Sequence, residues 1–244
     1  MFRFPFFPPL GWLILTLPFV AFGVGTKDEP LIVLPVGDSI TQGGKRDREE
    51  YTYRYPLQQL LHGLGIRYEF VGTRQAGLHA DAEWPEVAPG VPFDPDHAGY
   101  YGAKTRAVVN RVMKNWDEIE KTPHVALIHL GTNDQGSENH VEAVQKPLRE
   151  FIRFLRTKNP EICILLGHLN FRESEGALAI RPLVEELAEE MDTPESRVVT
   201  VHHYEGFVSN PKAEDTDTFD WAHPNPSGQR KMAERWLGTV TELR

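Results

Sequence analysis

Short apolar runs alternate with longer amphipathic segments along the chain after Pro30. The longer segments carry apolar residues at helical spacing and predict helices over residues 55–64, 105–116, 141–155, 176–191 and 228–243. The short runs predict buried strands over residues 31–36, 68–71, 124–130, 162–166 and 198–201. This alternation is typical of βαβ units and a parallel sheet. We therefore expect an α/β fold, a three-layer α/β/α sandwich around a five-stranded parallel sheet.

Residues 73–97 interrupt this alternation. The segment is rich in proline, glycine and acidic residues and has little periodicity, which predicts a long loop that is functional or mobile. Four aromatic residues in or just after it are candidates to stack on a sugar, although aromatic residues at such positions more often pack the loop itself: Trp84, Phe93, Tyr100 and Tyr101.

The amino terminus has the pattern of an export signal. Residues 4–25 carry no charge, and the apolar stretch from Leu10 to Val20 ends near the small-x-small sequence Ala21-Phe22-Gly23. An uncleaved anchor is the alternative, since 22 uncharged residues could span a bilayer, but four prolines break the stretch. We expect a signal peptide over residues 1–25, a single domain over residues 26–244, a secreted or periplasmic location, and no stable membrane partner after cleavage.

Composition narrows the classes of protein that this chain can be. With 40% hydrophobic and 25% charged residues it can bury a full core, which excludes a disordered or fibrous chain. The 35 acidic residues outnumber the 26 basic ones, and the net charge of -9 repels phosphate backbones, so no nucleic-acid partner is expected. The lone cysteine, Cys163, cannot close an intramolecular disulfide.

Ligands of open parallel sheets bind outside the carboxyl ends of the strands, so we looked for chemistry there. Gly37-Asp38-Ser39-Ile40 follows the first predicted strand, and Ser39 is a candidate nucleophile. A phosphate-binding loop is a weaker alternative, because its Gly-Lys-Ser/Thr ending is absent at Gly44-Lys45-Arg46. An ordinary strand-to-helix turn is the structural alternative.

Two further groups lie after other strands or near the carboxyl terminus. Asn133, within Gly131-Thr132-Asn133-Asp134, can donate a hydrogen bond to an oxyanion or cap a turn. Asp220 precedes His223 by three residues, so its carboxylate can fix the imidazole tautomer as general-base catalysis requires. A lone Asp-x-x-His is more often a surface turn.

Several histidine and acidic residues are also candidate metal ligands. His168 follows the fourth predicted strand, and His202 and His203 follow the fifth, but no third ligand stands at a fixed spacing. The pattern therefore favours substrate contact or loop packing over metal binding. Three acidic residues lack the glycine and terminal glutamate of a calcium loop and predict a solvated acidic loop: Glu214, Asp215 and Asp217.

The order and spacing of these groups resemble the SGNH hydrolase superfamily, also called GDSL-type esterases. The family's first block, Gly-Asp-Ser, matches at Gly37 to Ile40, its third, Gly-x-Asn-Asp, at Gly131 to Asp134, and its fifth, Asp-x-x-His, at Asp220 and His223. Residues 97–105 look like the His-x-Gly-x-x-Gly form of the carbohydrate-esterase branches and are the loosest match. The resemblance runs from Leu31 to the last predicted helix.

This resemblance implies a flavodoxin-like fold with strand order 2-1-3-4-5 and a catalytic triad of Ser39, Asp220 and His223. It also implies an oxyanion hole made by the N–H groups of Ser39 and Gly102, which we prefer to Gly99, and the amide of Asn133. No metal or cofactor is implied.

The expected substrate is a small-molecule or glycan ester. Export, the acidic aromatic loop and the His-x-Gly-x-x-Gly form favour acetyl esters on carbohydrate. A lysophospholipase or thioesterase acting on lipid esters is the nearest alternative. A non-catalytic binding module, the alternative from another class, would have no need for the serine, asparagine, aspartate and histidine together.

Overall fold

The computed structural model describes residues 29–44, 52–79, 84–171 and 173–243. The predicted signal peptide, residues 1–25, lies outside the described residues. Among the residues that are described, no helix is both long and apolar enough to cross a membrane.

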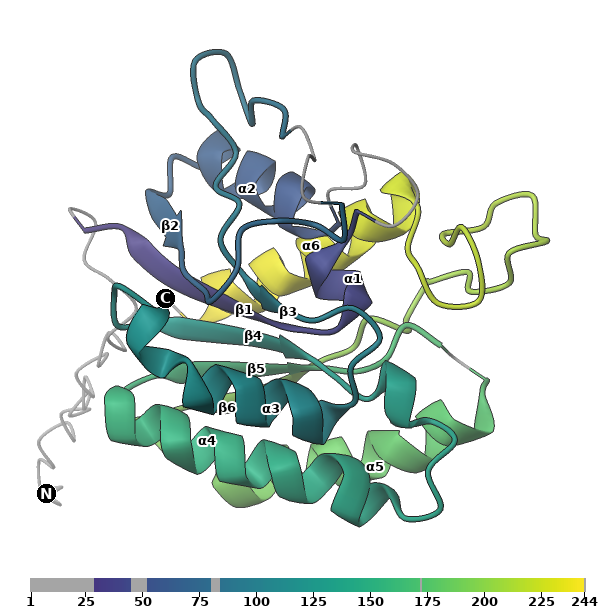
Figure 1. Ribbon diagram of the computed structural model, residues 1–244. Coiled ribbons are helices and arrows are strands. Elements are labelled where there is room, and N and C mark those ends of the chain that lie inside the picture. The colour runs from purple at the N-terminus through teal and green to yellow at the C-terminus, as the bar shows by residue number, and fades with distance from the viewer. Residues whose placement is uncertain (1–28, 45–51, 80–83, 172, 244) are drawn as a thin grey trace, which may run out of the picture.

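A parallel sheet lies at the centre of the described chain (Figure 1). Its main path runs β2-β1-β4-β5-β6, which confirms the expected order, since the third predicted strand is β4. The strands of this path are β1 (Leu31–Gly37), β2 (Tyr68–Phe70), β4 (Val125–His129), β5 (Cys163–Gly167) and β6 (Val198–Val201). Every residue of β1, β4 and β5 is buried, as their nearly continuous apolar sequences predict.

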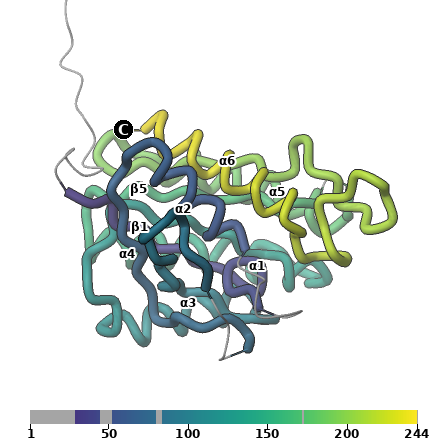
Figure 2. Tube along the Cα trace, turned by 90° about the horizontal axis from the view of Figure 1, so that it is seen from above, coloured from purple at the N-terminus to yellow at the C-terminus, as the bar shows by residue number. Residues whose placement is uncertain are grey.

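Helices cover both faces of the sheet. They are α1 (Ser39–Gln42), α2 (Arg54–Gly63), α3 (Thr105–Lys114), α4 (Lys146–Lys158), α5 (Glu175–Met191) and α6 (Pro226–Glu242). Helices α2 and α6 lie side by side on one face, and Figure 2 shows them nearest to the viewer. Helices α3, α4 and α5 cover the other face (Figure 1).

Strand β1 divides the apolar core into two parts. Leu31 and Val33 pack toward α2 and α6, whereas Ile32, Leu34 and Val36 pack toward α3, α4 and α5. This alternation follows from the two-residue period of a strand. Because both sides of β1 are filled, its carboxyl end is a rigid platform for the residues that follow it.

A short strand that the sequence did not predict, β3 (Ala98–Gly99), pairs with β1 at Val36 and Gly37. It directly follows the segment that we expected to be a loop. That segment is tied down at its ends, because the backbones of Arg74 and His97 exchange two hydrogen bonds of 3.0 and 2.8 Å. A Cβ on Gly99 would lie 2.6 Å from the backbone nitrogen of Gln42, so this close approach requires glycine.

The helix boundaries differ from the predicted ones for local reasons. Helix α6 begins at Pro226 rather than at residue 228, because the side chain of Asn225 accepts a hydrogen bond from the backbone of Gly228 and proline suits the first turn. The predicted helix over residues 141–155 begins with a π-helical turn, Val141–Gln145, before α4. A 3₁₀ turn, Trp116–Glu118, follows α3.

Candidate active site

Ser39 is the first residue of α1, directly beyond the carboxyl end of β1. The side chain of Asp38 caps this short helix by accepting a hydrogen bond from the backbone of Ile40 at 3.0 Å. Gly37 allows the tight turn, since a Cβ there would lie 2.1 Å from the Thr41 hydroxyl. The turn holds Ser39 in one place at the sheet edge with only 5% of its surface exposed.

The structure brings His223 and Asp220 to this serine. The Nε2 atom of His223 lies 3.1 Å from the Ser39 hydroxyl, and its Nδ1 atom lies 2.8 Å from Oδ1 of Asp220. A carboxylate can only accept, so the imidazole donates through Nδ1–H and keeps the Nε2 lone pair for the Ser39 hydroxyl. An imidazole held in this way can take a proton from the serine.

The turn that carries Asp220 and His223 is fixed by its own hydrogen bonds. The hydroxyl of Thr218 donates to the backbone carbonyls of both Asp220 and His223 at 2.7 Å. Burial alone would raise the pKa of Asp220, but hydrogen bonds from the backbones of Ala222 and His223 and from the imidazole hold that pKa below its usual range. Asp220 therefore stays ionised beside the imidazole.

Asn133 is predicted either to donate a hydrogen bond to an oxyanion or to cap a turn, and its contacts are those of a donor. Its Nδ2 atom donates to the carbonyl of Ala103 at 3.0 Å and to the carboxylate of Asp38 at 3.3 Å. The capping contact belongs to its neighbour Asp134, which accepts hydrogen bonds from the backbone and hydroxyl of Thr105 at the start of α3. The amide of Asn133 thus lies beside the residue that precedes Ser39.

The two glycines of residues 97–105 differ in their surroundings. Gly99 sits inside β3 and its N–H donates to Nδ1 of His97 at 2.9 Å, so that group is already engaged. Gly102 follows β3 in a turn, adopts a φ of +67°, and has open space where a Cβ would be. These surroundings favour Gly102 over Gly99 as a donor to substrate.

Two polar residues of the site were not assigned a role there from the sequence. Tyr101, considered only as a sugar-stacking residue, stacks on the His223 imidazole with ring centroids 5.6 Å apart, and its hydroxyl lies 3.2 Å from Nε2. Asp38 is fully buried, and burial raises its pKa to about 7. Each lies inside a motif block, at a position to which the sequence analysis gave no role in the site.

The aromatic side chains within the segment 73–97 pack the loop itself. The rings of Trp84 and Phe93 lie 5.0 Å apart, with the guanidinium of Arg54 within 5.5 Å of both ring centroids. An exposed aromatic ring lies instead next to Asp220. Trp221 is 60% exposed and stacks with Phe171 at 6.2 Å.

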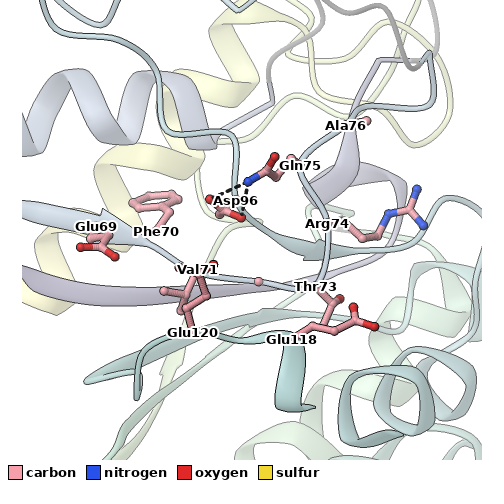
Figure 3. Close-up of a pocket in the computed structure, with 11 residues that line it drawn as sticks. Glu69, Phe70, Val71, Thr73, Arg74, Gln75, Ala76, Asp96, Glu118 and Glu120 are labelled. Carbon is pink, nitrogen blue, oxygen red and sulfur yellow. Dashed lines mark hydrogen bonds between the residues drawn. The ribbon is translucent and has the colours of Figure 1, made fainter. Parts of the chain in front are cut away.

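A cavity of about 490 Å³ opens at the carboxyl end of β2, but none of the five predicted site residues lines it. Figure 3 shows four acidic side chains around this cavity: Glu69, Asp96, Glu118 and Glu120. Gln75 donates a hydrogen bond to Asp96. Ser39, Asp220 and His223 therefore lie outside this hollow, and its acidic lining makes the hollow unsuited to an anionic ligand.

The prediction of a solvated acidic loop is wrong for Asp217. Its carboxylate is fully buried and accepts hydrogen bonds from the Val208 backbone, the Ser227 hydroxyl and the Lys231 ammonium. It therefore organises the segment that precedes Asp220 and His223. Glu214 and Asp215 are exposed, as expected.

The three histidines weighed as metal ligands separate into two groups. His203 is buried against Trp236, with ring centroids 4.4 Å apart. His168 and His202 lie together on the other side of the same sheet end, with ring centroids 5.2 Å apart. None of the three has a described contact with Ser39.

Comparison with known proteins agrees with this architecture. A multidomain esterase of Ruminococcus flavefaciens is 25% identical over 249 residues, and the match covers 93% of this chain but only 30% of that protein. Among solved structures, a carbohydrate esterase family 3 protein from Talaromyces cellulolyticus has a TM-score of 0.69 at 20% identity, over 87% of this chain and 97% of the other. A family 3 carbohydrate esterase of Clostridium thermocellum gives a TM-score of 0.68 at 23% identity, over 88% and 98%.

A third solved structure, a mutant acetyl esterase with an acetate ion, has a TM-score of 0.69 at 19% identity, over 88% of this chain and all of the other. At these identities the structures show a shared fold. The family itself is shown by a sequence model that matches residues 36–231, from the end of β1 into α6. The chain therefore belongs to the GDSL-like lipase/acylhydrolase family of carboxylic ester hydrolases, the SGNH hydrolases that its motifs resemble.

Proposed function

We propose that this protein is a serine esterase in which Ser39 is the nucleophile, His223 the general base and Asp220 the residue that orients it. One observation carries the proposal. Ser39 and His223 are 184 positions apart in the sequence, yet the folded chain joins them and Asp220 through hydrogen bonds of 3.1 and 2.8 Å. A serine, base and orienting carboxylate in this relation are what nucleophilic acyl transfer requires.

In the first half of the reaction, Nε2 of His223 takes the proton from Ser39 as its oxygen attacks the ester carbonyl. The negative charge that develops on the carbonyl oxygen is held by the N–H groups of Ser39 and Gly102 and by the amide of Asn133. The longer hydrogen bond of that amide, 3.3 Å to Asp38, is the one that the oxyanion would share or replace.

Collapse of the tetrahedral intermediate breaks the ester bond. His223 passes its proton to the leaving alcohol, and the acyl group stays on Ser39. A water molecule, deprotonated by His223, then attacks the acyl-enzyme and releases the carboxylic acid and the free serine. The residues of the chain supply every proton transfer in this scheme.

We further propose that the substrate is an acetyl ester on a carbohydrate. The solved structures with this fold include proteins named carbohydrate esterases and an acetyl esterase. The exposed face of Trp221 next to Asp220 fits the same substrate, because a flat apolar ring packs well against the apolar face of a sugar.

Release of acetate from acetylated polysaccharides tests this proposal, together with p-nitrophenyl esters of increasing acyl length. We expect acetate release and a kcat/KM that falls from acetyl to octanoyl esters. A clear rise of kcat/KM with acyl length would instead identify a lipid esterase. No ester hydrolysis by the folded protein would favour a non-catalytic binding module.

We also propose that the protein is exported, on the sequence of residues 1–25 alone. Amino-terminal sequencing of the mature protein from cells that express the full chain tests this. A mature chain that begins close to residue 26, outside the cytoplasm, is expected. Retention of residue 1 in a cytoplasmic protein would contradict it.

A further inference from the structure

A second histidine and carboxylate cluster lies at the ends of β5 and β6. These strands pair in register, with Gly167 opposite Val201, so the next residues, His168 and His202, emerge side by side. Glu185 reaches them from α5, which packs on this face of the sheet. Its Oε1 atom lies 2.5 Å from Nε2 of His168 and 3.1 Å from Nε2 of His202.

The side chains around the cluster hold its members in place. The hydroxyl of Thr200 donates to the second carboxylate oxygen of Glu185 at 3.0 Å. On the far side of the His202 ring, Nδ1 lies 3.3 Å from a carboxylate oxygen of Glu205. Glu205 is itself held by Arg235, whose guanidinium contacts both its side chain and its backbone carbonyl.

We propose that His168, Glu185 and His202 form a binding site for a divalent transition-metal ion, with zinc the best match. Two imidazole nitrogens and one carboxylate oxygen are a ligand set that zinc uses in proteins. The three ligand atoms lie within 4.8 Å of one another, and zinc bond lengths would place them roughly 3.3 Å apart, so small side-chain movements suffice.

The cluster also leaves room for the remaining ligands of the ion. His168 is buried, whereas the side chains of Glu185 and His202 are 37% and 38% exposed, so water can reach the open side. The sequence lacked a third ligand at a fixed spacing from the histidines. The fold supplies it from α5, 17 residues away from each of them.

Metal binding requires Nε2 of each ring to give up its proton. Without metal, a carboxylate oxygen accepts from both histidines, so each ring carries its proton on Nε2. With metal, Nε2 donates its lone pair to the ion and the proton sits on Nδ1. For His202 that proton then points at Glu205, the arrangement that orients many metal-bound histidines.

Two cationic side chains near the cluster limit its affinity for a metal ion. Arg235 is paired with Glu205, and Arg181 stacks on the ring of Tyr204, 3.7 Å from its centroid, next to both histidines. Their charges balance those of Glu185 and Glu205. An ion held by His168, Glu185 and His202 would tie α5 to the ends of β5 and β6.

Calorimetric titration of the full chain with zinc chloride, without a histidine tag, tests the proposal. One zinc ion per chain is expected. Removing a group that only orients a metal ligand typically weakens metal binding about 10–100-fold. His202 and Glu185 are proposed as direct ligands, so His202→Ala and Glu185→Gln should each weaken zinc binding by about 100-fold or more. Glu205→Gln should fall in the smaller range. His62→Ala, which removes an exposed histidine on α2, should bind like the wild type.

Circular dichroism and p-nitrophenyl acetate hydrolysis without metal show that the variants are folded, so weaker binding cannot be attributed to unfolding. Cobalt provides a second readout, because a four-coordinate site would give a visible absorption band that both variants lose. Zinc binding of equal strength in the wild type, His202→Ala and Glu185→Gln would overturn the proposal. So would the absence of saturable binding to the wild-type chain. Neither result would bear on the esterase.

Discussion

Two histidine and carboxylate clusters lie at the carboxyl end of the same sheet, and they differ in which ring nitrogen the carboxylate engages. Asp220 binds Nδ1 of His223, which leaves the Nε2 lone pair facing the Ser39 hydroxyl. Glu185 instead binds Nε2 of both His168 and His202. The first arrangement can move a proton to and from a nucleophile, whereas the second gathers three ligand atoms around one point.

The neighbours of the two clusters differ in the same sense. Ser39 at His223 is buried, and the amide of Asn133 donates to Asp38, the residue that precedes Ser39. The hydroxyl next to the Glu185 cluster, that of Thr200, donates to Glu185, and the cluster is partly exposed. Residue type alone therefore does not separate a catalytic histidine from a ligand histidine. The two kinds of histidine are separated by the atom that faces the ring nitrogen on the side away from the shared carboxylate.

The largest expected effect separates the two clusters directly. Ser39→Ala and His223→Ala should each lower kcat for p-nitrophenyl acetate by about 10⁴-fold or more, because they remove the nucleophile and its base. Asp220→Asn should be milder, since Asp220 orients the base and does not take the proton. His202→Ala should keep the wild-type rate. Substantial turnover by a folded Ser39→Ala protein would remove Ser39 from the mechanism.

The next effect tests the donor to the oxyanion. Asn133→Ala should lower kcat by about 10²–10³-fold, equivalent to roughly 3–4 kcal/mol, with little change in KM or in the urea midpoint. Its neighbour Asp134 provides the matched control. Because Asp134 caps α3, Asp134→Ala should cost on the order of 1 kcal/mol of unfolding free energy. A stability loss without a rate loss in Asn133→Ala would return that residue to a structural role.

The order of strands and the three motif blocks could be predicted because each leaves a local signal: an apolar run, a glycine turn, or an Asp-x-x-His spacing. Contacts that form only when helices and strands pack together leave no such local signal in the sequence. Glu185 is one of several glutamates along α5, and only the packing of α5 over β5 and β6 brings it to His168. Strand β3 is too short to show a period, and Trp221 gains its importance from the turn that exposes it.

A third prediction concerns Asp38, the buried carboxylate of the catalytic region. Burial raises its pKa from about 3.8 to about 7, so the folded protein holds this proton more tightly than the unfolded chain does. With respect to this group, the free energy of unfolding should therefore be greatest below pH 4 and fall as the pH rises from about 4 to 7, by roughly 4 kcal/mol. Urea unfolding of wild type and Asp38→Asn across this range measures the difference. Parallel curves would contradict the raised pKa.

The smallest effect compares two tyrosines that stack on the two kinds of histidine. The rings of Tyr101 and His223 and those of Tyr204 and His202 both have centroids 5.6 Å apart. Only Tyr101 also brings its hydroxyl to the Nε2 atom that serves the nucleophile, at 3.2 Å. Neutral Nε2 has one lone pair, so this hydroxyl competes with Ser39 for it.

Tyr101→Phe keeps the stacked ring and removes the competing hydroxyl. A net hydrogen bond is worth about 0.5–1.5 kcal/mol, so kcat should rise by up to about tenfold. Tyr204→Phe should leave the rate unchanged because His202 has no described contact with Ser39. Steady-state rates on p-nitrophenyl acetate for both variants decide the matter. A fall in kcat for Tyr101→Phe would mean that the hydroxyl assists the base, by orienting the imidazole or by passing a proton to the leaving alcohol.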